Sequence, residues 1–256
     1  MISIIRFTLI TAIRDLLFIG LLAVILTAMF ISCFLGSTAL VEQDQMTLAY
    51  MAGSTRLILV VGLVLFVCFH VRRSFDNKEI EVILTKPISK NLFVISYWLA
   101  FALLSVIITV PIVVIVAALK IANFNGLTFW GISLILEGIM IVAFAMLSAL
   151  IMKSAVASAL STLSFYFLSR MMGFFVATVS NFPTSFSLAS LPKWGSESIL
   201  KLVSTILPRL DLFGKTSWLV HGISNAGEIN IFLLQSLVYI PLLLAIIIFD
   251  FKRKQF

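Results

Sequence analysis

Six long apolar runs, separated by shorter polar stretches, divide this chain along its length. The runs cover residues 16–35, 47–71, 93–119, 129–152, 155–180 and 229–249. An α-helix needs about 20 apolar residues to cross the hydrocarbon core of a bilayer, and these runs match that length. A helix also satisfies its own backbone hydrogen bonds in lipid. The pattern predicts an all-α polytopic membrane protein with six transmembrane helices in a single domain, residues 1–256.

Residues 1–14, which precede the first run, have a helical period. Ile2, Ile5, Leu9 and Ile13 share one side of a helix, and Ser3, Arg6, Thr11 and Arg14 lie across from them. A helix with two such faces suits the plane of the membrane interface. We expect an amphipathic helix there, with an extension of the first span as the alternative.

The polar run over residues 72–90 separates the second span from the third. It carries five of the eighteen basic residues and three of the eleven acidic ones. Asp76 and Glu79 have the spacing of a capping box, in which Asp76 accepts a hydrogen bond from the backbone of residue 79 and Glu79 reaches back. The run therefore predicts a short helix that begins at Asp76.

The predicted helix has a single apolar stripe. Ile80, Ile83 and Leu84 fall at positions i, i+3 and i+4, and therefore on one face. Pro87 ends the helix, because proline lacks the N–H group and disfavours the α conformation in the residue before it. A polar helix with one apolar stripe, held between two spans, is suited to binding a cytoplasmic partner.

The longest stretch between spans, residues 181–228, holds three of the six prolines. We expect it outside the membrane, with short helices over residues 196–207 and 211–220, the second capped by Asp211.

Composition excludes an ordinary soluble domain, because 61% of the residues are hydrophobic, 11% are charged and the mean hydropathy is +1.18. The net charge of +7 does not indicate nucleic-acid binding, because the basic residues lie beside the spans. With both termini inside, eleven basic residues are cytoplasmic and six are external, as the positive-inside rule requires. Residues 72–92 are then cytoplasmic and residues 181–228 external. Arg56, near the outer end of its span, is expected to extend toward the lipid headgroups.

Glu137 and Arg170 are the charges placed deep inside predicted spans, at matching depths. A charge in hydrocarbon is usually paired or faces water. We expect an intramembrane ion pair that joins the fourth and fifth spans; a polar feature of a transport path is the alternative. Small residues at the start of the fifth span, Ala155, Ser158, Ala159 and Ser161, predict close packing with another helix.

Motifs for catalysis or nucleotide binding are absent from the sequence. It contains no G-x-x-x-x-G-K-[ST] loop, no G-x-S-x-G elbow and no H-E-x-x-H helix. His70 and His221 have no partners at metal-ligand spacing, and Cys33 and Cys68 lie in spans. We expect no cofactor or metal on this chain. A membrane-embedded enzyme that uses His70, His221 or Glu137 remains the less favoured class.

The residues Glu81 to Lys90, EVILTKPISK, resemble the ELLLTxPISR signature that follows the second span of ABC-2 type transporter permeases. This resemblance implies an N-terminal elbow helix over residues 1–14 and a coupling helix between spans two and three. The residues that it assigns to ATPase coupling are Asp76, Glu79, Ile80, Glu81, Ile83, Leu84, Thr85 and Pro87. The run LPRLDLF at residues 207–213 is also similar to a branch of the family labelled multicopper-enzyme maturation permease.

The resemblance also implies partners and a direction of transport. Two ATPase subunits, which carry ATP and Mg²⁺, would bind below two permease subunits in the inner membrane, and transport would be export. Membrane lipids are further expected partners. Lys78-Glu79 stands where the family usually has Gly-Thr, so a non-transporting assembly or anchoring subunit remains an alternative.

Overall fold

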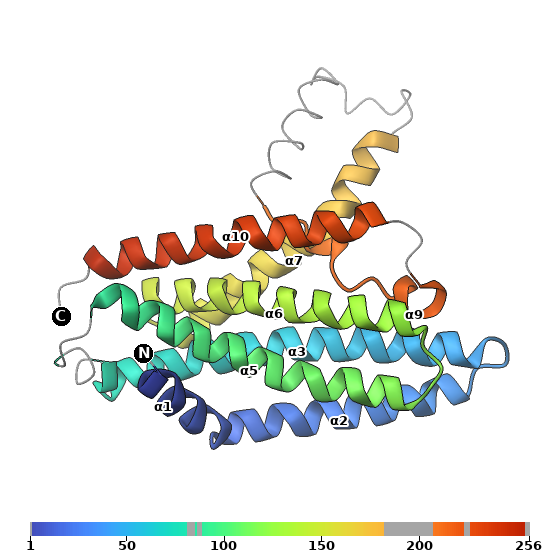
Figure 1. The fold of residues 1–256 in the computed structure, drawn as a ribbon, viewed down its shortest axis with the longest axis horizontal. Helices are drawn as coiled ribbons and strands as arrows, with labels where there is room; N and C mark the ends of the chain where they lie inside the picture. The colour runs from blue at the N-terminus through green and yellow to red at the C-terminus, as the bar shows by residue number, and fades with distance from the viewer. Residues whose placement is uncertain (1, 81–84, 86–88, 182–206, 223–225, 254–256) are drawn as a thin grey trace.

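A computed structural model describes residues 2–80, 85, 89–181, 207–222 and 226–253. Every regular element within these residues is helical, as predicted. The elements are α1 (Ile2–Ile13), α2 (Leu16–Ser37), α3 (Gln43–Asp76), α5 (Lys90–Ala118), α6 (Phe124–Ile151), α7 (Ala155–Asn181), η1 (Leu210–Leu212), α9 (Ser217–His221) and α10 (Ala226–Arg253). Figure 1 shows α2, α3, α5, α6 and α10 running side by side along one direction.

Five helices are long and apolar enough to cross a membrane: α2, α3, α5, α6 and α10. They coincide with five of the six predicted runs, and together they form the bundle of a multi-pass membrane protein. The remaining run, residues 155–180, is the predicted fifth span. It also forms a helix, α7, but over its described residues α7 is not among those five.

Side-chain caps explain why two helices begin earlier than the apolar runs predict. The Ser89 side chain accepts a hydrogen bond from the Leu92 N–H, and α5 begins at Lys90. The Asn123 side chain accepts one from the Gly126 N–H, and α6 begins at Phe124. Caps satisfy the first free N–H groups of a helix, and they can stand outside the apolar stretch that signals the span.

Helix α6 forms the centre of the bundle. Of its most apolar stretch, 72% is buried inside the chain, compared with 28% for α2 and 22% for α10. It contacts α3, α5, α7 and α10, and its Trp130 and Leu134 are completely buried. The outer helices α2 and α10 therefore turn apolar faces away from the chain, with Phe30 and Leu237 among the exposed side chains.

The connections gather at the two ends of the bundle (Figure 1). The first end holds α1, the connection between α3 and α5, the start of α7 and the last turn of α10, where Phe251 stacks on Phe93 at 5.6 Å. The second end holds the α2–α3 and α5–α6 connections and α9, where the Asn123 N–H donates to the Leu219 carbonyl at 2.9 Å. Because α7 starts at the first end and α9 lies at the second, residues 155–222 carry the chain across the bundle.

Helix α1 forms over the predicted residues, but its buried face differs from the expected one. Ile4, Thr8 and Ala12 are buried, and the helix packs against α5. Ile2, placed by the pattern on the apolar side, is 82% exposed. The buried positions at i, i+4 and i+8 hold one large aliphatic side chain, Ile4, and two smaller side chains, Thr8 and Ala12, which permit close contact with α5.

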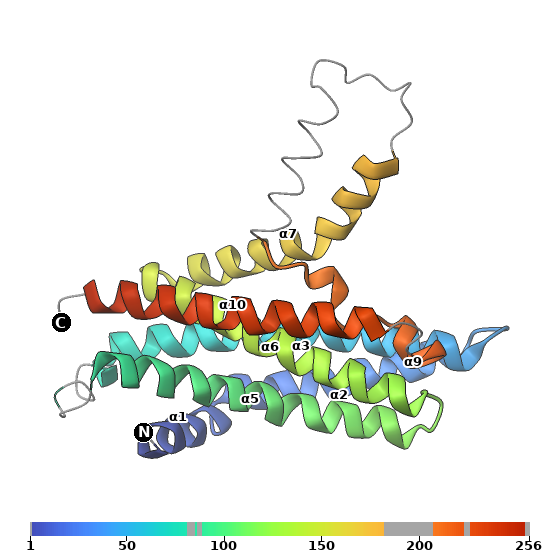
Figure 2. The ribbon, with the colours of Figure 1, turned by 45° about the horizontal axis from the view of Figure 1, so that its top comes forward.

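Helix α7 is the element that departs from the bundle. Its first half lies alongside α6, whereas its C-terminal part leaves the bundle and projects to one side (Figures 1 and 2). The predicted helix over residues 196–207 lies outside the described residues except for Leu207. The second predicted helix, over residues 211–220, is shorter than expected: Asp211 belongs to η1, and α9 begins only at Ser217.

Candidate functional site

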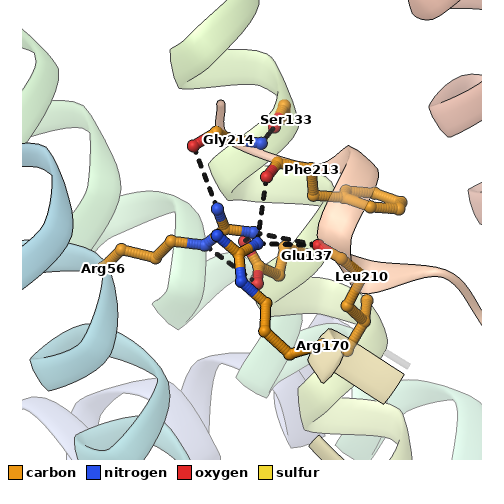
Figure 3. Close-up of polar contacts among 7 residues, drawn as sticks. All are labelled: Arg56, Ser133, Glu137, Arg170, Leu210, Phe213 and Gly214. Carbon is orange, nitrogen blue, oxygen red and sulfur yellow. Dashed lines mark hydrogen bonds and ion pairs between the residues drawn. The ribbon is translucent and has the colours of Figure 1, made fainter. Parts of the chain in front are cut away.

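Arg56 of α3 and Glu137 of α6 form an ion pair in the interior of the bundle (Figure 3). Arg56 Nη2 lies 2.6 Å from Glu137 Oε2, and Arg56 Nε donates a hydrogen bond to Oε1 at 3.1 Å. The Oε2 contact is ionic and lies outside hydrogen-bond geometry. The two side chains are 5% and 0% exposed. A guanidinium that meets both oxygens of a carboxylate forms one of the strongest polar contacts in proteins.

This pair corrects two expectations. Arg56 does not extend toward headgroups, because its side chain is buried against Glu137. Glu137 is not paired with Arg170, whose hydrogen bonds go to backbone carbonyls. Matching depth fixes the level of a side chain along a helix, but the direction around the helix axis selects its partner. At this level Glu137 contacts α3, and the guanidinium of Arg170 is turned toward η1.

Arg170 and Arg56 both bind the segment around η1. Arg170 Nη1 donates to the Leu210 carbonyl at 2.8 Å and to the Phe213 carbonyl at 3.1 Å. Arg56 Nη1 donates to the Gly214 carbonyl at 2.9 Å, and its Nη2 donates to the Leu210 carbonyl at 3.3 Å. The Leu210 carbonyl therefore accepts from two guanidinium groups that come from different helices (Figure 3). We call Arg56, Glu137 and Arg170 the arginine cluster.

The backbone of the bound segment approaches the helices closely. Gly214 has a φ of +52°, a region that glycine enters without strain, and its N–H donates to Ser133 Oγ of α6. A Cβ atom at Gly173 of α7 would overlap the Asp211 carboxylate, and one at Gly126 of α6 would overlap the Trp218 carbonyl. Residues 207–222 are thus fixed to α3, α6 and α7 by charge and by shape together.

The charges of the arginine cluster favour a structural role, in which the cluster holds the segment around η1 against the helices, over a catalytic role. Two guanidinium groups and one carboxylate leave one positive charge without an acidic partner in the cluster, and the carbonyl oxygens of the segment around η1 solvate it. Buried charges are tolerated when they are paired and hydrogen-bonded in this way. No group of three His, Cys, Asp or Glu residues able to hold a metal occurs among the described residues.

The small residues of α7 take two different positions. Ser158 and Ala159 are buried, and Ser158 exchanges hydrogen bonds with Ser148 of α6: Ser148 Oγ donates to the Ser158 carbonyl and Ser158 Oγ to the Ser148 carbonyl. Ala155 and Ser161 are only partly buried. A hydroxyl contact of 2.6 Å between Ser148 and Thr162 adds a link that sequence reasoning missed. Its signal was present, since Ser158 and Thr162 are one helical turn apart.

The two histidines lie at opposite ends of the bundle. His70 is buried near the first end, stacked on Phe66 at 5.4 Å, with its Nδ1 4.0 Å from Asp15 Oδ2. His221 ends α9 at the second end and is exposed. Neither histidine is joined to Glu137 by a contact among the described residues.

The connection between α3 and α5 differs locally from the capping box that the sequence suggests. Asp76 is the last residue of α3, and its carboxylate pairs with Arg72 at 2.8 Å instead of capping a new helix. Lys78 follows with a φ of +57°, and the chain is helical again at Glu79 and Ile80. Ile80 is 1% exposed and packs into the core, so it is not available to a partner.

Among the remaining coupling positions, Glu79 and Thr85 are exposed to different degrees at the first end, Thr85 in a turn. Glu81, Ile83, Leu84 and Pro87 lie outside the described residues. A scan against protein-family models found no match, and a search of curated proteins found no relative of this chain.

Proposed function

We propose that this chain is the permease subunit of an ATP-binding cassette transporter of the ABC-2 type, located in the inner membrane with both termini in the cytoplasm. The observation that carries the proposal is the sequence EVILTKPISK at residues 81–90, which stands in the connection between two span-capable helices, α3 and α5. That is the place of the coupling signature in the family. Residues 1–14 are the elbow helix, and α7 is the fifth of six spans.

The backbone at Lys78 supports the same assignment. Lys78 stands where the family usually has glycine, and its φ of +57° lies in the left-handed region that glycine favours. The departure in sequence therefore keeps the turn that leads into the coupling segment. A lysine at this position also adds a positive charge at the first end, where the proposal places the cytoplasm.

Helix α3 provides a mechanical route from the coupling segment to the arginine cluster. It runs unbroken for 34 residues, from Gln43 to Asp76. Arg56 and Asp76 are separated by 20 positions, about 30 Å along a helix. ATP binding closes the two ATPase partners, moves the coupling segment, and shifts α3 as a rigid rod. The Arg56–Glu137 pair passes that shift to α6 and to the segment around η1.

Two copies of such a subunit line the export pathway, with ATP and Mg²⁺ held on the two partner ATPases. An amphiphile, a peptide or a lipid fits the apolar faces that α2 and α10 present. An anchoring subunit that binds the ATPase without transport is the second candidate, because Ile80 is withdrawn into the core and shortens the apolar stripe left for a partner.

Co-purification from native membranes tests the proposal. We expect the wild-type chain to retain an ATPase, and Ile83→Asp to lose it because a carboxylate then enters the apolar contact. Leu40→Asp is the matched control: it adds the same charge in the α2–α3 connection at the second end, where Leu40 is 99% exposed. Retention by the wild type and by both variants alike would overturn the coupling assignment. An ATPase that binds without being stimulated would identify the anchoring subunit instead.

A further inference from the structure

A cavity of about 590 Å³ opens at the first end, between α1, the turn that follows it and the end of α3. Its walls have two chemical characters. Phe7, Ile10 and Leu16 form the apolar part, and Arg14, Asp15 and Arg73 form the polar part. The cavity is therefore amphipathic, with two guanidinium groups at one side and aliphatic and aromatic surface at the other.

The Asp15 carboxylate already forms hydrogen bonds within the protein. Its side chain caps α2 by accepting the Leu17 N–H at 3.1 Å, and it accepts a charge-assisted hydrogen bond from Arg73 Nη2 at 2.9 Å. Arg14 is exposed and forms no side-chain hydrogen bond or ion pair with the described residues. The polar wall thus carries a net positive charge, with the Arg14 guanidinium and the remaining Arg73 donors open to a ligand.

The position of the cavity matches the boundary of a bilayer. Helix α2, which is apolar enough to span a membrane, begins at Leu16, and Leu16 is itself part of the cavity wall. The guanidinium groups therefore lie at the level of the headgroups. Phe7, Ile10 and Leu16 are exposed apolar side chains that line the same cavity as these guanidinium groups.

We propose that this cavity binds one anionic phospholipid, with Arg14 and Arg73 donating hydrogen bonds to its phosphate and an acyl chain lying along Phe7, Ile10 and Leu16. Guanidinium groups present planar pairs of donors that match phosphate oxygens. The single excess positive charge favours a headgroup with net negative charge over a zwitterionic one. The lipid fixes α1 against the start of α2, at the membrane surface.

Native mass spectrometry of the full chain in detergent tests this with phosphatidylglycerol and phosphatidylcholine of identical acyl chains. We expect one phosphatidylglycerol to be retained in preference to phosphatidylcholine, and Arg14→Gln to weaken its binding about tenfold, since a charge-assisted contact is lost. Arg73→Lys keeps the positive charge beside Asp15 but removes the planar fork, and a several-fold loss is expected.

Arg6→Gln is the matched control, because Arg6 lies on α1, which ends one residue before Arg14, is exposed, and does not line the cavity. Equal losses for Arg6→Gln and Arg14→Gln would show general surface attraction and overturn the site. Equal retention of the two lipids would do the same. Competition by glycerol 3-phosphate at the concentration of phosphatidylglycerol would reveal a site for phosphate alone, and would overturn the assignment to a lipid.

Discussion

Arg56 and Glu137 lie 81 positions apart in the sequence and meet inside the bundle, with a separation of 2.6 Å between Nη2 and Oε2. The pair joins α3, which leads to the proposed coupling segment, to α6, which forms the centre of the fold. Around it, Arg170 and the segment around η1 complete the polar contacts. The functional proposal and the stability of the bundle therefore depend on the same two side chains.

The pairing of Arg56 with Glu137 predicts strong non-additivity between substitutions. Glu137→Gln leaves two guanidinium groups without a carboxylate, and we expect a loss of roughly 3–5 kcal/mol, the usual cost of breaking a buried pair. Arg56→Gln should cost a similar amount, and the double variant should cost much less than the sum. Unfolding in detergent, monitored through the loss of helical signal, measures the free energy of unfolding of all three variants.

A second double-mutant cycle, with Arg170→Gln in place of Arg56→Gln, serves as the control. Arg170 binds carbonyl groups, so its coupling to Glu137→Gln should be clearly weaker than that of Arg56. A larger coupling for Arg170 would restore the ion pair that depth alone suggested and would contradict the geometry described above.

Gly126→Ala should loosen the contact between α6 and α9. The added Cβ overlaps the Trp218 carbonyl, and the backbone of Trp218 can move away only if α9 shifts from its place against α6. Overpacking of this kind costs roughly 1–3 kcal/mol. Gly53→Ala in α3 is the control, because a Cβ there meets nothing within 4 Å. Proteolysis at residues 207–222 should accelerate for Gly126→Ala alone; identical rates for the two variants would refute tight docking of α9.

Lys78→Gly should stabilise the connection after α3. A non-glycine residue in the left-handed region carries a penalty of about 1–2 kcal/mol, and part of it is offset by the greater freedom of glycine in the unfolded chain. We expect a small rise in the melting temperature in detergent. Lys78→Ala, which keeps the Cβ atom, should give no rise. An equal rise for both variants would assign the effect to the lost charge.

The two ends of the bundle predict the accessibility of single cysteines. In a variant that lacks Cys33 and Cys68, Thr85→Cys at the first end should react only with reagent from the cytoplasmic side, and Lys120→Cys at the second end only with reagent from outside. A second pair of cysteines tests the path of residues 155–222. Labelling of Lys153→Cys and Ser217→Cys from the same side would exclude a crossing by these residues.

Much of the helical layout follows from the sequence, because a run of about 20 apolar residues has few alternatives to a membrane helix. The starts of α5 and α6 were missed by several residues, since Ser89 and Asn123 are polar caps that hydropathy does not register. The prediction that residues 155–180 cross the membrane stays a prediction, because α7 forms over that run but its described residues are not among the five span-capable helices.

The arginine cluster could be predicted only in part. Glu137 and Arg170 were recognisable as buried charges from their positions within apolar runs, but the partner of Glu137 was not. Arg56 lies nine positions into its run of residues 47–71, about as deep as Glu137 in its run of residues 129–152, but a long side chain in the outer half of a span can also extend toward the headgroups. What decides its burial is the rotation of α3 against α6, which depends on packing between residues far apart in the chain, such as Gly138 against Leu63.

The order of synthesis gives the Arg56–Glu137 contact a further consequence. The ribosome completes α3 before Glu137 has been made, so Arg56 enters the membrane without its acidic partner. An unpaired arginine in a nascent span costs roughly 2.5–3.5 kcal/mol at the centre of a helix. The apolar length of α3 offsets that cost until α6 emerges, and Arg56 acquires its last carbonyl acceptors only when residues 210–214 follow. A chain that stops translation after α5 therefore presents a charged membrane helix to the quality-control proteases of the cell.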